Sequence, residues 1–167
     1  MSGKFHGRRE DHRLVTGRGR YTSDWDFPDQ VYAHFLRSDR GHAEVRGVDV
    51  SEALATPGVL AVLTGADTMA AGFGSAPSLI HYPGKDGMKF ITVHREVMAE
   101  TRVRFVGQEV ALVVATSQSI AQDAAEKIVV DYHDLPVVVD AEEALKPGAP
   151  QLYDHVPNNL VFDFEYG

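Results

Sequence analysis

Short runs of apolar residues, some alternating with polar ones, predict most of the strands of this chain. The clearest runs cover residues 31–37, 43–50, 59–63, 110–115 and 128–132. They are rich in Val, Ile, Leu and aromatic residues, which is typical of strands with at least one buried face. Two shorter runs, 103–106 and 137–139, predict further strands. The Gly-Gln-Glu segment 107–109 is expected to form a bend or bulge between two of these strands.

Three short helices are predicted between the strands, at residues 52–56, 118–127 and 141–145. Each follows a side chain that can accept a hydrogen bond from the first helical turn, namely Ser51, Ser117 and Asp140. For the last of them, Asp140 and Glu143 are expected to form a capping box. Small alanines share one face of the helix 118–127, so this helix is expected to lie close on a sheet.

Residues 68–95 show no periodicity and are rich in glycine and proline. A stretch of this length is too long for a passive connection, so it is expected either to bind something or to carry a small hairpin. The segment 160–166, in contrast, alternates apolar and acidic side chains. Such alternation predicts a strand with one buried face, offered to a partner or belonging to a longer polypeptide.

Charge is distributed unevenly along the chain, whose formal net charge is −8. Residues 1–20 carry six basic and two acidic side chains, while residues 117–167 carry ten acidic and two basic ones. The basic start is expected to be an extended arm, either folding back on the acidic end or docking on a partner. Binding to nucleic acid is disfavoured, since the rest of the chain would repel phosphate.

Residue types and spacings exclude most kinds of active site. The chain has no cysteine, which excludes thiol nucleophiles, cysteine-ligated metals and disulfides. None of its eight histidines follows a metal-binding spacing, and no nucleophile elbow or phosphate loop is present. The longest apolar run, 110–115, is far shorter than the ~20 residues of a membrane span. These features predict a soluble, cytoplasmic protein without an active site of its own.

Several segments nevertheless resemble one family, in order along the chain. They are residues 17–21, 33–38, 42–43, 48–49, 57–67, 103–111, 121–132, 135–136 and 157–160. Together they resemble the a/b hammerhead domain of the aldehyde oxidase and xanthine dehydrogenase family. This domain opens the molybdenum-binding large subunit of molybdenum hydroxylases, including carbon monoxide dehydrogenases. Only residues 68–95 lack a match.

The resemblance implies an α+β fold, a mixed β-sheet with a few short helices, over residues 21–167. Residues 1–20 would form the basic arm and residues 68–95 an irregular insertion. Enzymes of this family hydroxylate an aldehyde, purine or N-heterocycle, or oxidise carbon monoxide, with water as the oxygen source. They use a molybdopterin (Mo) cofactor, [2Fe-2S] clusters and FAD. The Mo-site residues of the family lie beyond this domain, so none is assigned here.

The resemblance also suggests where this chain would meet substrate and partners. The insertion would help to line the substrate entrance, with Phe73, Ile80, Tyr82 and Phe90 as wall residues, unless these side chains pack on their own domain. Contacts with the molybdenum-cofactor, iron–sulfur and FAD domains or subunits are expected from a second set, formed by Arg18, Arg20, Gln108, Phe162, Phe164 and Tyr166. For the two arginines, binding to the acidic end of the chain itself is slightly favoured, because that segment is the nearest acidic partner. A free-standing ligand- or protein-binding module is the alternative function, and a hydrolase using His and Asp the weakest.

Overall fold

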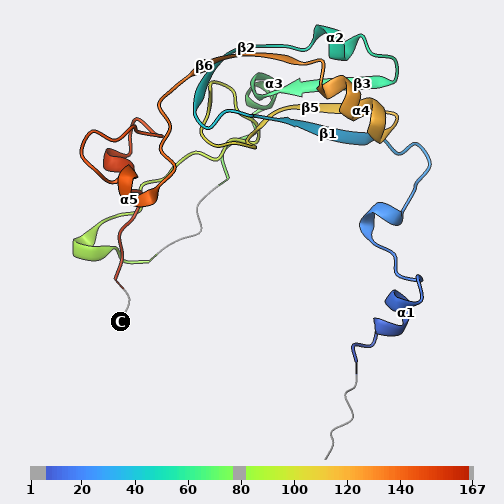
Figure 1. The fold of residues 1–167 in the computed structure, drawn as a ribbon, viewed down its shortest axis with the longest axis horizontal. Helices are drawn as coiled ribbons and strands as arrows, with labels where there is room; N and C mark the ends of the chain where they lie inside the picture. The colour runs from blue at the N-terminus through green and yellow to red at the C-terminus, as the bar shows by residue number, and fades with distance from the viewer. Residues whose placement is uncertain (1–6, 77–81, 166–167) are drawn as a thin grey trace, which may run out of the picture. The chain divides into compact units, whose positions relative to one another are not determined.

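The computed structural model describes residues 7–76 and 82–165 of the 167-residue chain (Figure 1). It divides into two compact units, Met1–Gln30 and Val31–Gly167. The first unit contains α1 (Asp11–Val15) and the 3-10 turn η1 (Thr22–Asp24), neither of which holds a buried residue. The expected extended arm 1–20 therefore contains a helical turn, α1, and its boundary with the hammerhead domain at residue 21 stays a prediction. The turn forms because the Asp11 carboxylate accepts a hydrogen bond from the Arg8 amide at 2.7 Å.

Three antiparallel strands of the second unit form the sheet that we call sheet A, in the order β1-β5-β3. The strands are β1 (Tyr32–Arg37), β5 (Glu109–Ala115) and β3 (Val59–Thr64). The central strand, β5, has the longest unbroken apolar run of the sequence. A strand with neighbours on both sides and a covered face is expected to be this apolar.

The remaining strands form sheet B, in the order β4-β2-β6, which is also antiparallel. These strands are β4 (Arg102–Val103), β2 (Ala43–Asp49) and β6 (Val129–Asp134), with a bulge between Val45 and Gly47 of β2. The expected α+β class is confirmed. In place of the one mixed β-sheet that was predicted, the strands form two small antiparallel sheets.

The core lies between sheet A and the helix α4 (Gln118–Ala125), which Figure 1 shows against β5 and β1. The three alanines of α4 at positions 121, 124 and 125 are buried against Ala111, Val113 and Ala115 of β5. Small side chains on both elements permit this close approach, as the sequence predicted. Val48 and Val130 of sheet B pack against this cluster and also against a second one around Val103 and Val110. The two sheets therefore share one apolar interior.

The predicted caps are confirmed at two of the three helices. The Ser117 hydroxyl accepts a hydrogen bond from the Ile120 amide at 3.2 Å, and one Asp140 oxygen accepts from the amides of Glu142 and Glu143, each at 2.9 Å. The latter contacts begin α5 (Ala141–Ala144). In α2 (Ser51–Leu54), however, Ser51 is the first helical residue, and its amide and hydroxyl donate to Asp49.

The insertion is only partly irregular. It begins within α3 (Gly65–Ala70) and contains the 3-10 turn η2 (Lys85–Gly87). Its last residue, Arg95, is joined to residues 75 and 76 within it: the Ala76 amide donates to the Arg95 carbonyl at 3.3 Å, and the Arg95 amide donates to the Ser75 hydroxyl. The described residues of the insertion contain no hairpin ladder.

Three strand predictions were wrong in whole or in part. Of the predicted strand 103–106, only Val103 lies in a strand, β4. The strand ends there because the Arg104 amide donates its hydrogen bond to the Gln108 side chain and not to a neighbouring strand. Residues 137–139 are not a strand, and Val139 is 94% exposed. The described residues 160–165 belong to no strand, and two backbone hydrogen bonds join them to residues 85–91.

Candidate functional site

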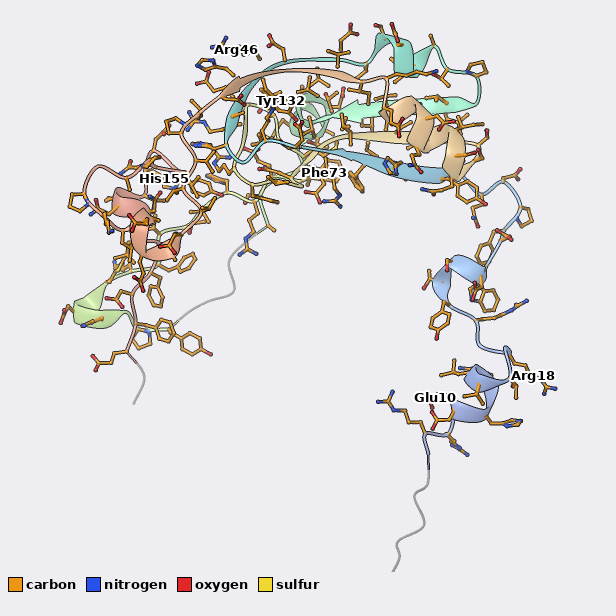
Figure 2. The ribbon with its side chains drawn as sticks, viewed as in Figure 1. Glu10, Arg18, Arg46, Phe73, Tyr132 and His155 are labelled. Carbon is orange, nitrogen blue, oxygen red and sulfur yellow. The ribbon has the colours of Figure 1, made fainter. Side chains whose placement is uncertain are left out.

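The described insertion residues 82–95 pack on the C-terminal segment 152–164 of the same unit. The amides of Lys85 and Ile91 donate to the carbonyls of Asp163 and Val161, at 2.9 and 3.0 Å. A ring nitrogen of His155, labelled in Figure 2, lies 3.0 Å from the Thr92 carbonyl oxygen. These hydrogen bonds hold residues 85–92 of the insertion against the C-terminal segment.

Aromatic rings line this contact. The ring centroids of Phe90 and Phe162 lie 5.8 Å apart, and Phe164 stacks on Phe162 at 5.7 Å with the planes inclined by 17°. Phe90 and Phe162 are half-buried, whereas Phe164 is 58% exposed. Phe90 thus packs on its own domain, which is the alternative that the sequence left open for it. The acidic residues that alternate with these rings, Asp163 and Glu165, are exposed.

The proposed wall residues are not all brought together. Tyr82 and Phe90 line one hollow, with Gly84 and Met88 between them. Phe73 is exposed, and Figure 2 shows it beside the sheets, away from the lobe that carries His155. Ile80 of this set, and Tyr166 of the partner set, lie outside the described residues. The geometry is therefore that of an open aromatic surface around Tyr82 and Phe164, which line a second hollow together with Pro83 and Glu165.

Gln108, predicted to contact a partner, points into its own loop. Its side chain is only 8% exposed, and Oε1 accepts a hydrogen bond from the Arg104 amide at 2.7 Å. The neighbouring Gly107 adopts φ +91°, a conformation that favours glycine, as expected for a bend. The residues that this loop presents to solvent are Phe105 and Val106, which are 56% and 68% exposed.

Arg18 and Arg20 lie in the first unit. The Arg20 guanidinium lies 4.8 Å from the centre of the Trp25 ring, a cation–π contact, and the two residues border a hollow with Thr22 and Phe27. The Arg18 amide donates to the Arg13 carbonyl at 2.8 Å. Binding of these arginines to a partner or to the acidic segment of the chain stays a prediction.

Sequence reasoning missed the residues that hold the C-terminal segment in place. Asn159 donates to the carbonyls of Ala144 and Pro150 and accepts from the Leu152 amide, each at 2.9 Å. The Arg104 guanidinium stacks 4.4 Å from the Tyr153 ring centre. Asn159 belongs to the block 157–160 that resembles the family, and its side chain positions the C-terminal segment.

Few groups in the described residues have shifted acidities. Hydrogen bonds from Thr64 lower the pKa of the exposed Asp67, and those from Ser51 lower the pKa of Asp49. Burial raises the pKa of Tyr132. None of these groups forms a nucleophile–base pair with a neighbour described above. The described residues contain neither a cluster of three metal-ligating side chains nor a helix long and apolar enough to cross a membrane.

Comparison with known proteins gives the arrangement a context. Residues 16–136 match the family described as "Aldehyde oxidase and xanthine dehydrogenase, a/b hammerhead domain". The carbon monoxide dehydrogenase large chain of Afipia carboxidovorans is 39% identical over 92% of this chain, and the nicotinate dehydrogenase large molybdopterin subunit of Eubacterium barkeri is 30% identical over 92%. The crystal structure of quinoline 2-oxidoreductase from Pseudomonas putida 86 superposes with a TM-score of 0.76 at 40% identity over 88% of this chain.

The match covers only a small part of these relatives. This chain spans 18% of the carbon monoxide dehydrogenase chain, 33% of the nicotinate dehydrogenase subunit and 18% of the quinoline 2-oxidoreductase chain. The similarity therefore concerns one domain of each relative.

Proposed function

We propose, since this chain belongs to the a/b hammerhead domain family of aldehyde oxidases and xanthine dehydrogenases, that it is the hammerhead part of a molybdenum hydroxylase. In this role it holds the assembly together and carries no Mo-site residue itself. The observation that carries the proposal is the family match over 16–136 combined with the superposition on a solved oxidoreductase. The relatives named for molybdopterin or for CO oxidation are much longer than this chain, so the chemistry belongs to the remainder of such an enzyme.

The partners follow from the same proposal. A molybdenum-cofactor domain or subunit would pack on this chain. Iron–sulfur and FAD subunits would carry electrons away from the molybdenum cofactor. The reaction class is hydroxylation of an aldehyde, purine or N-heterocycle, or oxidation of CO, with oxygen from water. The chain would work in the cytoplasm as one part of that complex.

Purification from the native host tests this function. An affinity tag on this chain should recover a larger assembly that contains iron, flavin and molybdenum, together with polypeptide in addition to these 167 residues. Recovery of a lone monomer with a bound small molecule would contradict the proposal. It would instead support a free-standing binding module built on the same domain.

A contribution of the insertion to the substrate entrance is part of the proposal. The exposed Tyr82 and Phe73 support it, because large exposed aromatic side chains are suited to contact a planar substrate. Replacing the two exposed aromatic residues Phe73 and Tyr82 together by alanine in the purified enzyme should raise KM while leaving kcat nearly unchanged. The matched control is Val139→Ala, an exposed residue outside the insertion. An unchanged KM for every substrate would remove the insertion from the entrance.

A further inference from the structure

The face of sheet A that points away from α4 is entirely apolar at its centre. Strand residues alternate between the two faces, and Ala111, Val113 and Ala115 of β5 are buried in the core. Leu112 and Val114 therefore point to the opposite, outer face. The register places one residue of each edge strand beside them.

Two rows of side chains make up this outer face. Ala33 of β1 pairs with Val114, which pairs with Ala61 of β3. Phe35 pairs with Leu112, which pairs with Leu63 in the same way. The exposed fractions of Phe35 and Leu63 are 38% and 39%. We call these six residues (Ala33, Ala61, Val114, Phe35, Leu63 and Leu112) the outer patch.

Sheet B of the same molecule shows what a solvated face looks like. Its inner positions are apolar, but the side chains that alternate with them are charged or polar, as at Glu44, Asp131 and His133. Such alternation is the usual pattern for an antiparallel sheet with one face in water. The outer patch lacks it, because no charged residue occupies either of its rows. Its composition is that of a buried interface.

The edge of the patch agrees with this interpretation. Where β1 and β5 run beyond the two rows, Arg37 and Glu109 form an ion pair at 2.7 Å, and the Arg37 guanidinium lies 5.8 Å from the Phe35 ring centre. The patch is therefore apolar at its centre and bordered at one end by an ion pair that neutralises itself, which agrees with the apolar core and polar rim of a protein–protein interface. A neutral, apolar polypeptide surface fits it, whereas a charged ligand does not.

The chain lengths indicate which polypeptide that is. More than four fifths of the carbon monoxide dehydrogenase large chain and of the quinoline 2-oxidoreductase chain lies outside the segment that matches this chain, since the match covers 18% of each. In each of these relatives that remainder belongs to the same polypeptide as the matched segment, so it is the polypeptide nearest to hand. We propose that the outer patch is the surface on which the molybdenum-cofactor-bearing remainder of the enzyme packs through a neutral, apolar surface of its own. This inference rests on the proposed function and adds the place of contact.

The absence of cysteine from the sequence permits a direct test in the purified assembly. Ala33→Cys introduces a thiol in the outer patch, and Arg46→Cys introduces one on sheet B at a side chain that is 52% exposed. Both variants are purified from the host with their assembly and treated with a maleimide, and the labelled fraction of each cysteine-containing peptide is measured by mass spectrometry. The cysteine at 33 should be protected and that at 46 labelled.

Three results would overturn the inference, and they differ from one another. Equal labelling of the two cysteines in a molybdenum-containing assembly would remove the outer patch from the interface but leave the proposed function intact. A wild-type preparation without molybdenum would refute the function and the inference together. Protection of position 33 in a dimer of this chain without cofactor-bearing polypeptide would assign the patch to a second copy.

A charge placed in the patch gives a second measurement. Leu63→Glu should sharply reduce the molybdenum that copurifies with the tagged chain. Val129→Glu is the matched control, because it makes the same kind of change at a 65% exposed strand position of sheet B and should leave the molybdenum content at the wild-type level. Far-UV circular dichroism of both variants verifies that they are folded. Wild-type molybdenum content in a folded Leu63→Glu preparation would contradict the inference.

Discussion

Gly65, the first residue of α3, lies against the backbone of the segment that leads into sheet B. A Cβ atom added at this position would lie only 2.3 Å from the Ala99 carbonyl oxygen, and backbone cannot move aside as a flexible side chain can. The glycine therefore permits β3 and α3 to approach residues 99–100. Its role is steric, since no positive φ is required of it.

Gly65→Ala should consequently destabilise the chain. We expect a loss of about 2 kcal/mol in the free energy of unfolding, as for other forced contacts in packed regions. The matched control is Gly47→Ala in β2, where an added Cβ would meet nothing within 4 Å and should change the free energy by less than about 0.5 kcal/mol. Urea denaturation of both variants measures the difference. Equal stabilities would contradict the account of this contact.

Gln108 has a comparable local role. Removing its amide in Gln108→Ala would leave the Arg104 amide without its 2.7 Å acceptor, at a cost of about 1–3 kcal/mol. Gln118→Ala, at an exposed position of α4, is the control and should be nearly neutral. Thermal unfolding compares the two. A neutral Gln108→Ala that instead weakened the purified assembly would restore Gln108 to the partner interface.

At the scale of single elements, hydrogen bonds at the start of α3 make stability depend on pH. The Asp67 carboxylate accepts from the amide and the hydroxyl of Thr64, both at 2.7 Å, and these bonds lower its pKa in the folded chain. A carboxyl whose folded pKa is depressed contributes stability above its unfolded pKa, and that contribution is lost as the pH falls through the folded pKa.

Asp67→Asn should therefore flatten the acid side of the stability profile. Between pH values of about 5 and about 3, around the ordinary aspartate pKa, wild-type stability should decline more steeply than that of the variant. Thr64→Val, which removes the hydroxyl donor, should reduce the slope in part. Urea unfolding at several pH values provides the measurement. An Asp67→Asn profile as steep as wild type would show that this carboxylate contributes nothing to the acid lability.

The helix α4 depends on its small residues for packing. Ala124 is fully buried between α4 and sheet A, so Ala124→Leu would force the helix away from β5, at a cost of about 1–3 kcal/mol. Gln122→Leu introduces the same leucine side chain at an exposed position of the same helix and should leave the stability nearly unchanged. The unfolding temperatures of the two variants should differ by several degrees. No difference would mean that α4 is not held by close contact.

Elements were predictable from sequence where their determinants are local. The apolar runs gave β1, β2, β3, β5 and β6 to within a few residues, and the Ser117 and Asp140 side chains marked two helix starts correctly. The failures at 137–139 and 160–165 have one cause. Apolar content or alternation shows that a segment can form a strand, but the ladder depends on a neighbouring strand elsewhere in the chain.

The candidate site was less predictable than the fold for the same reason. Phe90 and Phe162 are far apart in sequence, and their contact follows from the packing of the insertion on the C-terminal segment. The inward turn of Gln108 likewise depends on the path of one loop. The outer patch, in contrast, becomes visible only when the register of three strands is known, because each of its rows takes one residue from each strand.

At the scale of the whole molecule, the larger of the two units, Val31–Gly167, has an apolar interior of its own and one sheet face whose central side chains are apolar. The charge of the chain is uneven along the sequence, since residues 117–167 carry ten acidic and two basic side chains and none of them belongs to the outer patch. Family membership, the short span of the match in longer relatives and the composition of the outer patch all favour a part that functions within a larger enzyme.

The molar ratio of molybdenum to this chain in material purified from the native host tests that claim most directly. Elemental analysis of the peak that contains the tagged chain on size exclusion should find molybdenum equimolar with the chain, at an elution volume that corresponds to a much larger particle than 18.3 kDa. A peak of the isolated chain's own mass without molybdenum would contradict the account.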